Sequence, residues 1–140
     1  YLSLAEFCRR IEMGEFVEWA EVHGQLYGTL RSDLDQKLAS GKDLILELDV
    51  LGMRNLKATF PDAVTVFIMA PSLDELERRL RERGTDDEAS IRLRLKNAEM
   101  EMAAINEYDH VIVNEDLDVA IRQMKDIIRE NRRAPGQTGA

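Results

Sequence analysis

Two acidic side chains stand out because each shares a stretch of sequence with apolar residues. Glu18 alternates with apolar neighbours in FVEWAEV, and Asp49 comes near the end of the apolar run LILELDV. Two carboxylates could accept hydrogen bonds from the ring N1–H and the N2 amino group of guanine, and would repel adenine, whose N1 is an acceptor. The plainer alternative is that Asp49 caps the next helix and Glu18 pairs with an arginine, and spacing alone favours it.

Hydroxyl groups follow a short way along the chain. Tyr27 and Thr29 flank a glycine in the stretch YGT. Because Gly28 has no Cβ, a phosphate or carbonyl group could approach the backbone between the two hydroxyls. The same residues also suit a tight turn with solvated hydroxyls, and both interpretations stay open on sequence alone.

Arginines are concentrated in the stretch from residue 78 to residue 94. They are Arg78, Arg79, Arg81, Arg83, Arg92 and Arg94. A turn around Gly84 would let Arg83 and Arg94 face one space, where planar guanidinium groups suit the spread negative charge of phosphoryl transfer. The competing interpretation is a solvated helix face with ion pairs four residues apart, which fits Arg78, Arg79 and Arg92.

Cysteine, tryptophan and histidine are assigned no chemistry. The single cysteine, Cys8, is expected to pack as a small apolar residue, and Trp19 is expected in the core. Together with Cys8, the scattered His23 and His110 make no zinc site, so no metal site is predicted. A lone cysteine cannot form an intrachain disulfide, and a reducing, cytoplasmic setting is the expectation.

Hydrophobic periodicity predicts the elements that must hold these side chains. Strands are expected at 16–22, where apolar residues alternate, and as buried runs at 44–50, 63–69 and 110–114. Helices are expected at 3–14, 31–40, 53–57, 71–84, 85–106 and 117–132, with capping boxes at Ser3/Glu6, Ser72/Glu75 and Thr85/Glu88. This alternation predicts an α/β fold with a parallel sheet. Ligands of such sheets lie at the carboxyl ends of strands, which makes Asp49 and Asn114 candidates.

Bulk composition restricts the class of protein. The 140 residues suit one compact domain with 44% apolar residues, and the net charge of −8 makes the surface acidic. Neither nucleic acid nor an anionic membrane is an expected partner, because both require a basic surface. No apolar run approaches the roughly 18 residues of a membrane-spanning helix, and no signal peptide is visible.

Four stretches, taken in order, resemble the bacterial guanylate kinase family. They are GEFVEWAEVHGQLYGT, LILELDVLG, FPDAVTVFIMAPSLDELERRLRERGTDDEASIRLRL and YDHVIVNEDLD. The resemblance runs from residue 1 to about 132 and implies a P-loop NTPase-type, three-layer α/β fold with a parallel sheet. It implies a GMP-binding region at about 1–36, core at 37–80, a lid at 81–100, and core with a C-terminal helix at 101–132. A disordered tail is expected at 133–140.

The resemblance also implies an activity, the transfer of a phosphoryl group from MgATP to GMP in purine nucleotide metabolism. Glu18 matches the acid that reads guanine N1 and N2, and Asp49 matches a second acid at the base. Tyr27 matches a tyrosine whose hydroxyl meets the GMP phosphate, and Thr29 matches a hydroxyl residue of the same pocket.

On the ATP side, the resemblance implies three further residues. Arg83 and Arg94 match lid arginines that close on the phosphates, and they are the expected catalytic residues. Asn114 lies where the family approaches the adenine of ATP.

The sequence departs from the family in one large respect. The family begins with a strand, a G-x-x-G-x-G-K-[ST] loop and a helix, and the 140 residues contain no such loop. Since the amides and lysine of a P-loop hold the ATP phosphates, the chain alone is expected to be inactive. Sheet edges exposed by a missing strand would offer a route to self-association. A smaller departure is Leu51, where the family usually has glutamine.

A second class of function stays open. Guanylate-kinase-like domains of membrane-associated scaffolds bind phosphopeptides or proteins at the former GMP site and do not catalyse. The presence of Glu18, Asp49, Arg83 and Arg94 favours the enzyme lineage, because a peptide binder has no evident need for base-reading acids and a full lid. A nonfunctional remnant is the third alternative.

Overall fold

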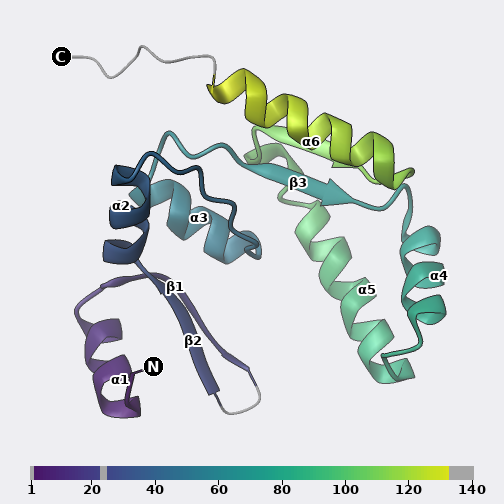
Figure 1. The fold of residues 1–140 in the computed structure, drawn as a ribbon. Coiled ribbons are helices and arrows are strands. Elements are labelled where there is room, and N and C mark those ends of the chain that lie inside the picture. The colour runs from purple at the N-terminus through teal and green to yellow at the C-terminus, as the bar shows by residue number, and fades with distance from the viewer. Residues whose placement is uncertain (1, 23–24, 133–140) are drawn as a thin grey trace. The chain divides into compact units, whose positions relative to one another are not determined.

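The computed structural model describes residues 2–22 and 25–132. The chain divides into two compact units, Tyr1–Ala63 and Val64–Ala140. Helices and strands alternate along most of the chain, and one strand pair is parallel, so the α/β class with a parallel sheet is confirmed (Figure 1). The tail expected at 133–140 lies outside the described residues.

The first unit contains an antiparallel hairpin of β1 (Phe16–Val22) and β2 (Gln25–Leu30), drawn in dark blue in Figure 1. Its register begins at Phe16↔Leu30 and has a β-bulge between Phe16 and Glu18. The strand expected at 16–22 is confirmed. The alternative of a tight turn at residues 27–29 is wrong, since these residues lie inside β2. A glycine in a short strand resembles a turn signal, which is why sequence patterning missed it.

Gly28 lies at a point of β2 where a side chain would not fit. A Cβ at this position would lie 2.7 Å from Cδ1 of Phe16 and 2.9 Å from the carbonyl oxygen of Glu18. The Phe16 ring stacks on Phe7 with ring centroids 4.3 Å apart, and Phe7 is a buried residue of α1 (Leu4–Glu12). The glycine therefore allows the close packing that joins α1 to the hairpin.

We expect Gly28→Ala to lower the free energy of unfolding of the first unit by about 1–3 kcal/mol, as overpacking of a tight site does. The phenyl ring can turn aside, but the backbone oxygen of Glu18 cannot. Urea unfolding followed by the fluorescence of Trp19 measures this, because Trp19 is the only tryptophan and lies opposite Gly28. Ser40→Ala, at an exposed site, should change the value by less than about 0.5 kcal/mol. Equal urea midpoints for Gly28→Ala and wild type would contradict this prediction, because they would show that the hairpin accommodates a Cβ at position 28 without loss of stability.

The remaining helices of the first unit confirm the capping signals. Ser3 caps α1 by accepting a hydrogen bond from the backbone N–H of Glu6 at 3.2 Å. Gly14, with φ of 66°, follows the end of α1, and Gly41, with φ of 74°, follows the end of α2 (Arg31–Ala39). Both glycines occupy the left-handed region that disfavours other residues, so each ends its helix at the expected place.

The buried strand expected at 44–50 is wrong. Residues 42–49 belong to no helix or strand, and Ile45 is 78% exposed. The next helix, α3 (Val50–Thr59), is longer than the expected 53–57. A strand exists only through hydrogen bonds to a neighbouring strand, and in the described part of the chain none pairs with this segment. The segment has the apolar pattern of a strand, but no strand in the described part of the chain pairs with it.

Two residues expected to be packed are exposed. Cys8 is exposed because its neighbour Phe7 takes the core-facing position of α1, and successive helical residues point about 100° apart. Trp19 is 49% exposed, since a two-stranded hairpin offers few neighbours to cover so large a ring. Both expectations are therefore corrected.

The second unit is built on a parallel pair, β3 (Val66–Met69) and β4 (His110–Val113), with α6 (Leu117–Arg132) packed on β4 (Figure 1). The strands expected at 63–69 and 110–114 are confirmed in position, although both are shorter. Their burial on both faces is wrong, because Ile68 is 55% exposed whereas Ile112 is 2% exposed. A sheet of two strands has two open edges, so few of its side chains can be enclosed.

A buried polar clamp begins the parallel pair. Thr65, which is 5% exposed, donates to Oδ2 of Asp109 from its backbone nitrogen at 2.9 Å and from Oγ1 at 2.8 Å. The backbone nitrogen of Asp109 donates in return to Oγ1 of Thr65 at 3.0 Å. Because these residues immediately precede the pair Val66↔His110, the clamp fixes the register of the sheet.

Two helices join the strands, α4 (Leu73–Arg83) and α5 (Glu88–Met102), and they pack side by side (Figure 1). Ser72 caps α4 as expected, and Gly84 ends it in the left-handed conformation. The cap expected at Thr85 is wrong, since Asp87 caps α5 by accepting from the backbone nitrogen of Ser90 at 2.8 Å. The helix expected to run to 106 ends at Met102, and a short 3-10 helix follows at Ile105–Glu107.

Candidate functional site

Three of the expected site residues lie on one face of the β1–β2 hairpin. Glu18 is paired with Thr29, and Tyr27 is paired with the residue two positions after Glu18. Directly opposed residues of an antiparallel pair project to the same side, so the acid, the threonine and the tyrosine share that side. Tyr27 is 59% exposed there. The hairpin thus gathers two hydroxyls and a carboxylate on one surface.

Glu18 and Thr29 contact each other directly. Oγ1 of Thr29 donates to Oε1 of Glu18 at 2.7 Å, and both side chains are partly buried. Among the described residues this is the hydrogen bond of the Glu18 carboxylate, and no arginine pairs with it. The alternative of an arginine partner for Glu18 is therefore wrong. The threonine holds one carboxylate oxygen in place, and Oε2 remains an acceptor for a ligand.

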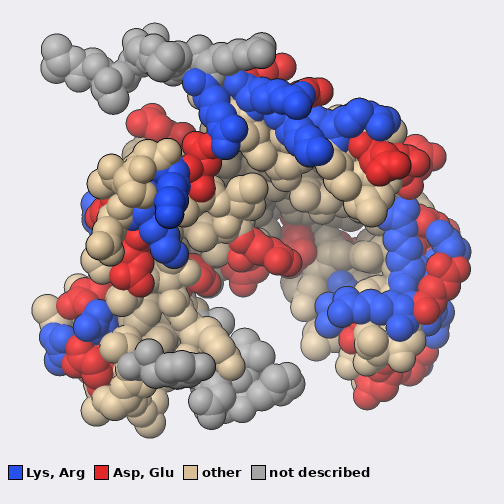
Figure 2. Space-filling view, in the orientation of Figure 1, with Lys and Arg blue, Asp and Glu red and all other residues tan. Residues whose placement is uncertain are grey.

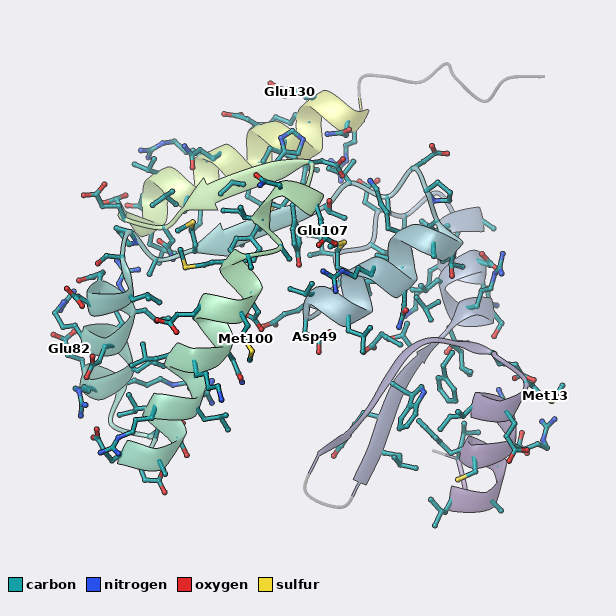
Figure 3. The ribbon with its side chains drawn as sticks, turned by 180° about the vertical axis from the view of Figure 1, so that it is seen from behind. Met13, Asp49, Glu82, Met100, Glu107 and Glu130 are labelled. Carbon is teal, nitrogen blue, oxygen red and sulfur yellow. The ribbon has the colours of Figure 1, made fainter. Side chains whose placement is uncertain are left out.

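Asp49 lies at the start of α3, where Figure 3 labels it. Its Oδ1 accepts a hydrogen bond from the backbone nitrogen of Gly52 at 2.7 Å, so the alternative of a helix cap is confirmed. The cap uses one oxygen and fixes the orientation of the carboxylate, while Oδ2 is still an acceptor. Because α3 packs against β1, Asp49 and Glu18 are carried by two elements in contact.

Four of the six arginines are held in ion pairs on the surface of α4 and α5. The pairs are Arg78 with Glu75 and Glu82, Arg79 with Glu75, Arg81 with Glu77 and Glu88, and Arg92 with Glu88. Figure 2 shows the resulting interleaved acidic and basic atoms over α4. Hydrogen bonds from Arg78 and then Arg79 lower the pKa of the Glu75 carboxyl to about 2. The interpretation of a solvated helix face is therefore confirmed for Arg78 and Arg92. Arg79 makes the expected pair with Glu75, but its side chain is only 33% exposed.

Arg83 and Arg94 differ from these four. Arg83, the last residue of α4, is exposed and makes no ion pair with another described residue. Arg94 is half-exposed in α5, and its Nε lies 3.3 Å from Oδ1 of Asp86. The other oxygen of Asp86 is buried without a hydrogen-bond partner in the described part of the chain. Of the two arginines expected to bind phosphates, Arg83 thus makes no ion pair with another described residue, and Arg94 makes one.

Asn114 lies at the carboxyl end of β4, as expected. Its backbone nitrogen donates to the carbonyl oxygen of Met69 at 2.7 Å, and its own carbonyl oxygen accepts from Nη1 of Arg79 at 2.7 Å. The contact with Arg79 was missed from sequence, because a side chain that binds backbone carbonyls 35 positions away leaves no local pattern. The ion pair of Asp86 with Arg94 was likewise not predicted.

Two features are absent from the part of the chain that the structure describes. Within residues 2–22 and 25–132, no three His, Cys, Asp or Glu side chains gather in a way that could hold a metal ion. None of the helices there has the length and apolar character needed to cross a bilayer.

Known proteins resemble this chain over nearly its whole length. The family model for guanylate kinase matches residues 1–131. Guanylate kinases of Thermotoga maritima and Aromatoleum aromaticum are 40% and 46% identical to it over 132 residues, which is 94% of this chain. The chain spans 64% and 65% of the length of those two relatives.

A solved structure gives the same result for the fold. The crystal structure of guanylate kinase from Anaplasma phagocytophilum superimposes with a TM-score of 0.68 at 33% sequence identity. The match covers 93% of this chain and 63% of that one. Sequence and structure agree over both compact units, and the chain therefore belongs to the guanylate kinase family.

Proposed function

We propose that this chain supplies the GMP-binding, lid and C-terminal parts of a guanylate kinase acting on GMP and MgATP. In the reaction an oxygen of the GMP phosphate forms a bond to the γ-phosphorus of ATP. The bond from that phosphorus to the β–γ bridging oxygen breaks, which gives GDP and ADP. The observation that carries the proposal is the hydrogen bond from Thr29 to Glu18, which orients the carboxylate on one face of the β1–β2 hairpin. The chain that carries this pair belongs to the guanylate kinase family.

On the GMP side, Glu18 accepts the hydrogen bonds of guanine N1–H and N2–H. Thr29 holds Oε1 of Glu18 in place, so the carboxylate does not have to be ordered when the base binds. Asp49 supplies a second acceptor at the base, and its helix cap keeps it fixed. Tyr27, exposed on the same face as Glu18, donates its hydroxyl to the GMP phosphate. Adenine presents an acceptor at N1 and leaves these carboxylates unpaired.

On the ATP side, Arg83 and Arg94 bind the phosphates and stabilise the charge of the transferring group. The exposure of Arg83, which makes no ion pair with another described residue, and the half-exposed position of Arg94, whose one ion pair is with Asp86, support this role. The side-chain amide of Asn114 offers one donor and one acceptor, which suits the edge of adenine. Magnesium enters with the ATP phosphates as part of the co-substrate. A cytoplasmic setting goes with these two substrates.

The regions proposed from the family are a GMP-binding part at 1–36, core at 37–80 and 101–132, and a lid at 81–100. The arginine-bearing helices α4 and α5 contribute to that lid. No nucleic acid or membrane partner is proposed, in line with the acidic charge. Self-association of the isolated chain is proposed through the open edges of β3 and β4.

The test compares two proteins. One is the 140-residue chain, and the other is a completed kinase, in which the chain is joined to the P-loop-bearing N-terminal segment of a bacterial guanylate kinase. We expect GMP-dependent ADP release from the completed kinase and none above background from the chain alone, because the chain has no loop to hold the ATP phosphates.

Calorimetry completes the test by following binding without turnover. GMP should bind to the completed kinase and AMP should not. Robust turnover by the chain alone would contradict its proposed inactivity. A folded completed kinase that binds a phosphopeptide but turns over no GMP would favour the scaffold-type binding module.

A further inference from the structure

Arg79 is the one arginine of α4 that reaches from its own helix to the loop that follows β4. Its Nε donates to Oε1 of Glu75 at 2.7 Å on α4. Its Nη1 donates to the carbonyl oxygen of Asn114 at 2.7 Å, and its Nη2 reaches the carbonyl oxygen of Glu115 at 3.3 Å. One guanidinium therefore joins α4 to two successive carbonyls of the loop between β4 and α6.

Each residue of this loop has its backbone or side chain fixed. The backbone nitrogen of Asn114 donates to Met69 of β3, and Oδ1 of Asp116 accepts from the backbone nitrogen of Val119 at the start of α6. Arg79 donates to the carbonyl oxygens of Asn114 and Glu115, which lie just after the last paired residue of β4. With its backbone engaged at both ends, Asn114 has only its side-chain amide left for a ligand, and that amide has no hydrogen bond to another described residue.

Arg78, the neighbour of Arg79, forms ion pairs on the surface of α4 without contacting the loop. Arg78 pairs with the same Glu75 and also with Glu82, which Figure 3 labels on α4. It is 55% exposed and makes no loop contact, whereas Arg79 is 33% exposed. Hydrogen bonds from Arg78 and then Arg79 lower the pKa of Glu75, so that carboxylate stays charged well below neutral pH and anchors the Arg79 side chain.

We propose that Arg79 is a positioning residue for the adenine nucleotide: its guanidinium holds the 114–116 loop so that the Asn114 amide faces the co-substrate. This inference rests on the proposed kinase function and adds to it a residue that acts through its contacts with the loop. Ligands of parallel sheets bind at the carboxyl ends of strands, where this loop lies. Arg79 also lies one helical turn before Arg83 on α4. Its contacts with the loop therefore hold the part of α4 that carries Arg83, the arginine proposed to bind phosphate.

The first experiment uses hydrogen exchange on the 140-residue chain. In Arg79→Gln we expect the amides from Asn114 to Val119 to exchange about tenfold faster, because the loop loses its link to α4. Arg78→Gln removes two neighbouring ion pairs, with Glu75 and Glu82, and should leave this exchange unchanged. Equal exchange in the Arg79→Gln variant and the wild type would overturn the proposal. This measurement does not depend on which reaction the protein catalyses.

The second experiment measures steady-state kinetics of the completed kinase. Arg79→Gln should raise KM for ATP about tenfold and leave KM for GMP within about twofold, since only the adenine side is misplaced. Arg79→Lys, which can donate to one carbonyl but lacks the planar fork, should recover part of the loss. Arg78→Gln should match wild type in both constants.

The outcomes separate this proposal from the proposed function. If KM rises equally for both substrates, or if only thermal stability falls, Arg79 is a structural residue and the inference is wrong. If the wild-type completed kinase turns over no GMP, the proposed function fails, and the nucleotide role of Arg79 fails with it even where hydrogen exchange confirms the loop contact.

Discussion

Arg94→Met in the completed kinase is expected to lower kcat about 10³-fold and to change KM for GMP less than about threefold. Phosphoryl transfer depends on positioning and on charge stabilisation, and a transition-state arginine contributes about 10³-fold or more. Arg94 has only Asp86 beside it at 3.3 Å and is half-exposed, so it can leave that partner for an anion. Methionine keeps most of the volume and removes the charge. Coupled ADP-release kinetics with varied GMP and ATP measure both constants.

Arg92→Met is the matched control, because Arg92 lies two residues earlier on α5 and its Nε is 3.6 Å from Glu88. Its side chain is 77% exposed, and kcat should stay within about twofold of wild type. The proposed role of Arg94 is wrong if both variants lose activity equally. It is also wrong if Arg94→Met raises KM for GMP with kcat unchanged, since that result would place the arginine at ground-state binding of GMP.

Helix ends could be predicted from sequence because their causes are local. Ser3 and Ser72 each accept a hydrogen bond from a backbone nitrogen three residues later, and Gly14 and Gly84 each adopt the left-handed conformation after a helix. Such interactions need only neighbouring residues, so spacing carries the information. The exception at Thr85 has a local cause too, since the carboxylate of Asp87 takes the cap and starts the helix later.

Strands were predicted less well because a strand depends on distant partners. The run at 44–50 has the right residues, yet Ile45 is exposed and no described strand pairs with the segment. Strand β2 was missed for the opposite reason: Gly28 gives it a weak pattern, but β1 supplies the hydrogen bonds. Apolar content reports what a segment can bury, and only the fold determines what lies beside it.

The candidate site shows the same division. Residue types suggested carboxylates for a base and guanidinium groups for phosphates, and the family supplied their places in order. The direct contact of Thr29 with Glu18 and the link from Arg79 to Asn114 came only from the structure, since each joins residues that are distant in sequence. Sequence therefore suggested the chemical groups, while the structure showed which contacts Glu18 and Asn114 make.

Glu18→Gln in the completed kinase should raise KM for GMP about 100-fold and leave kcat within about threefold. The amide of glutamine keeps one acceptor oxygen for Thr29 and turns an NH₂ group toward the guanine donors, so an attractive contact becomes a repulsive one. A charge-assisted hydrogen bond contributes about 1.5–3 kcal/mol, and about 1.4 kcal/mol is a factor of ten in affinity. Varying GMP at saturating ATP measures the change, and AMP measured in parallel gives the loss of discrimination.

Glu15→Gln provides the matched control at the entrance to the same hairpin. Glu15 lies 3.6 Å from Arg10 in an ion pair, and its substitution should leave KM for GMP within about twofold. The double variant Glu18→Gln with Thr29→Val tests whether Thr29 acts only by orienting the Glu18 carboxylate. If Thr29 acts only by holding Glu18, its loss should weaken GMP binding in wild type but have little further effect once Glu18 is glutamine. Full additivity of the two substitutions would mean that Thr29 contacts GMP itself, and the hairpin would then bind the nucleotide through two independent groups.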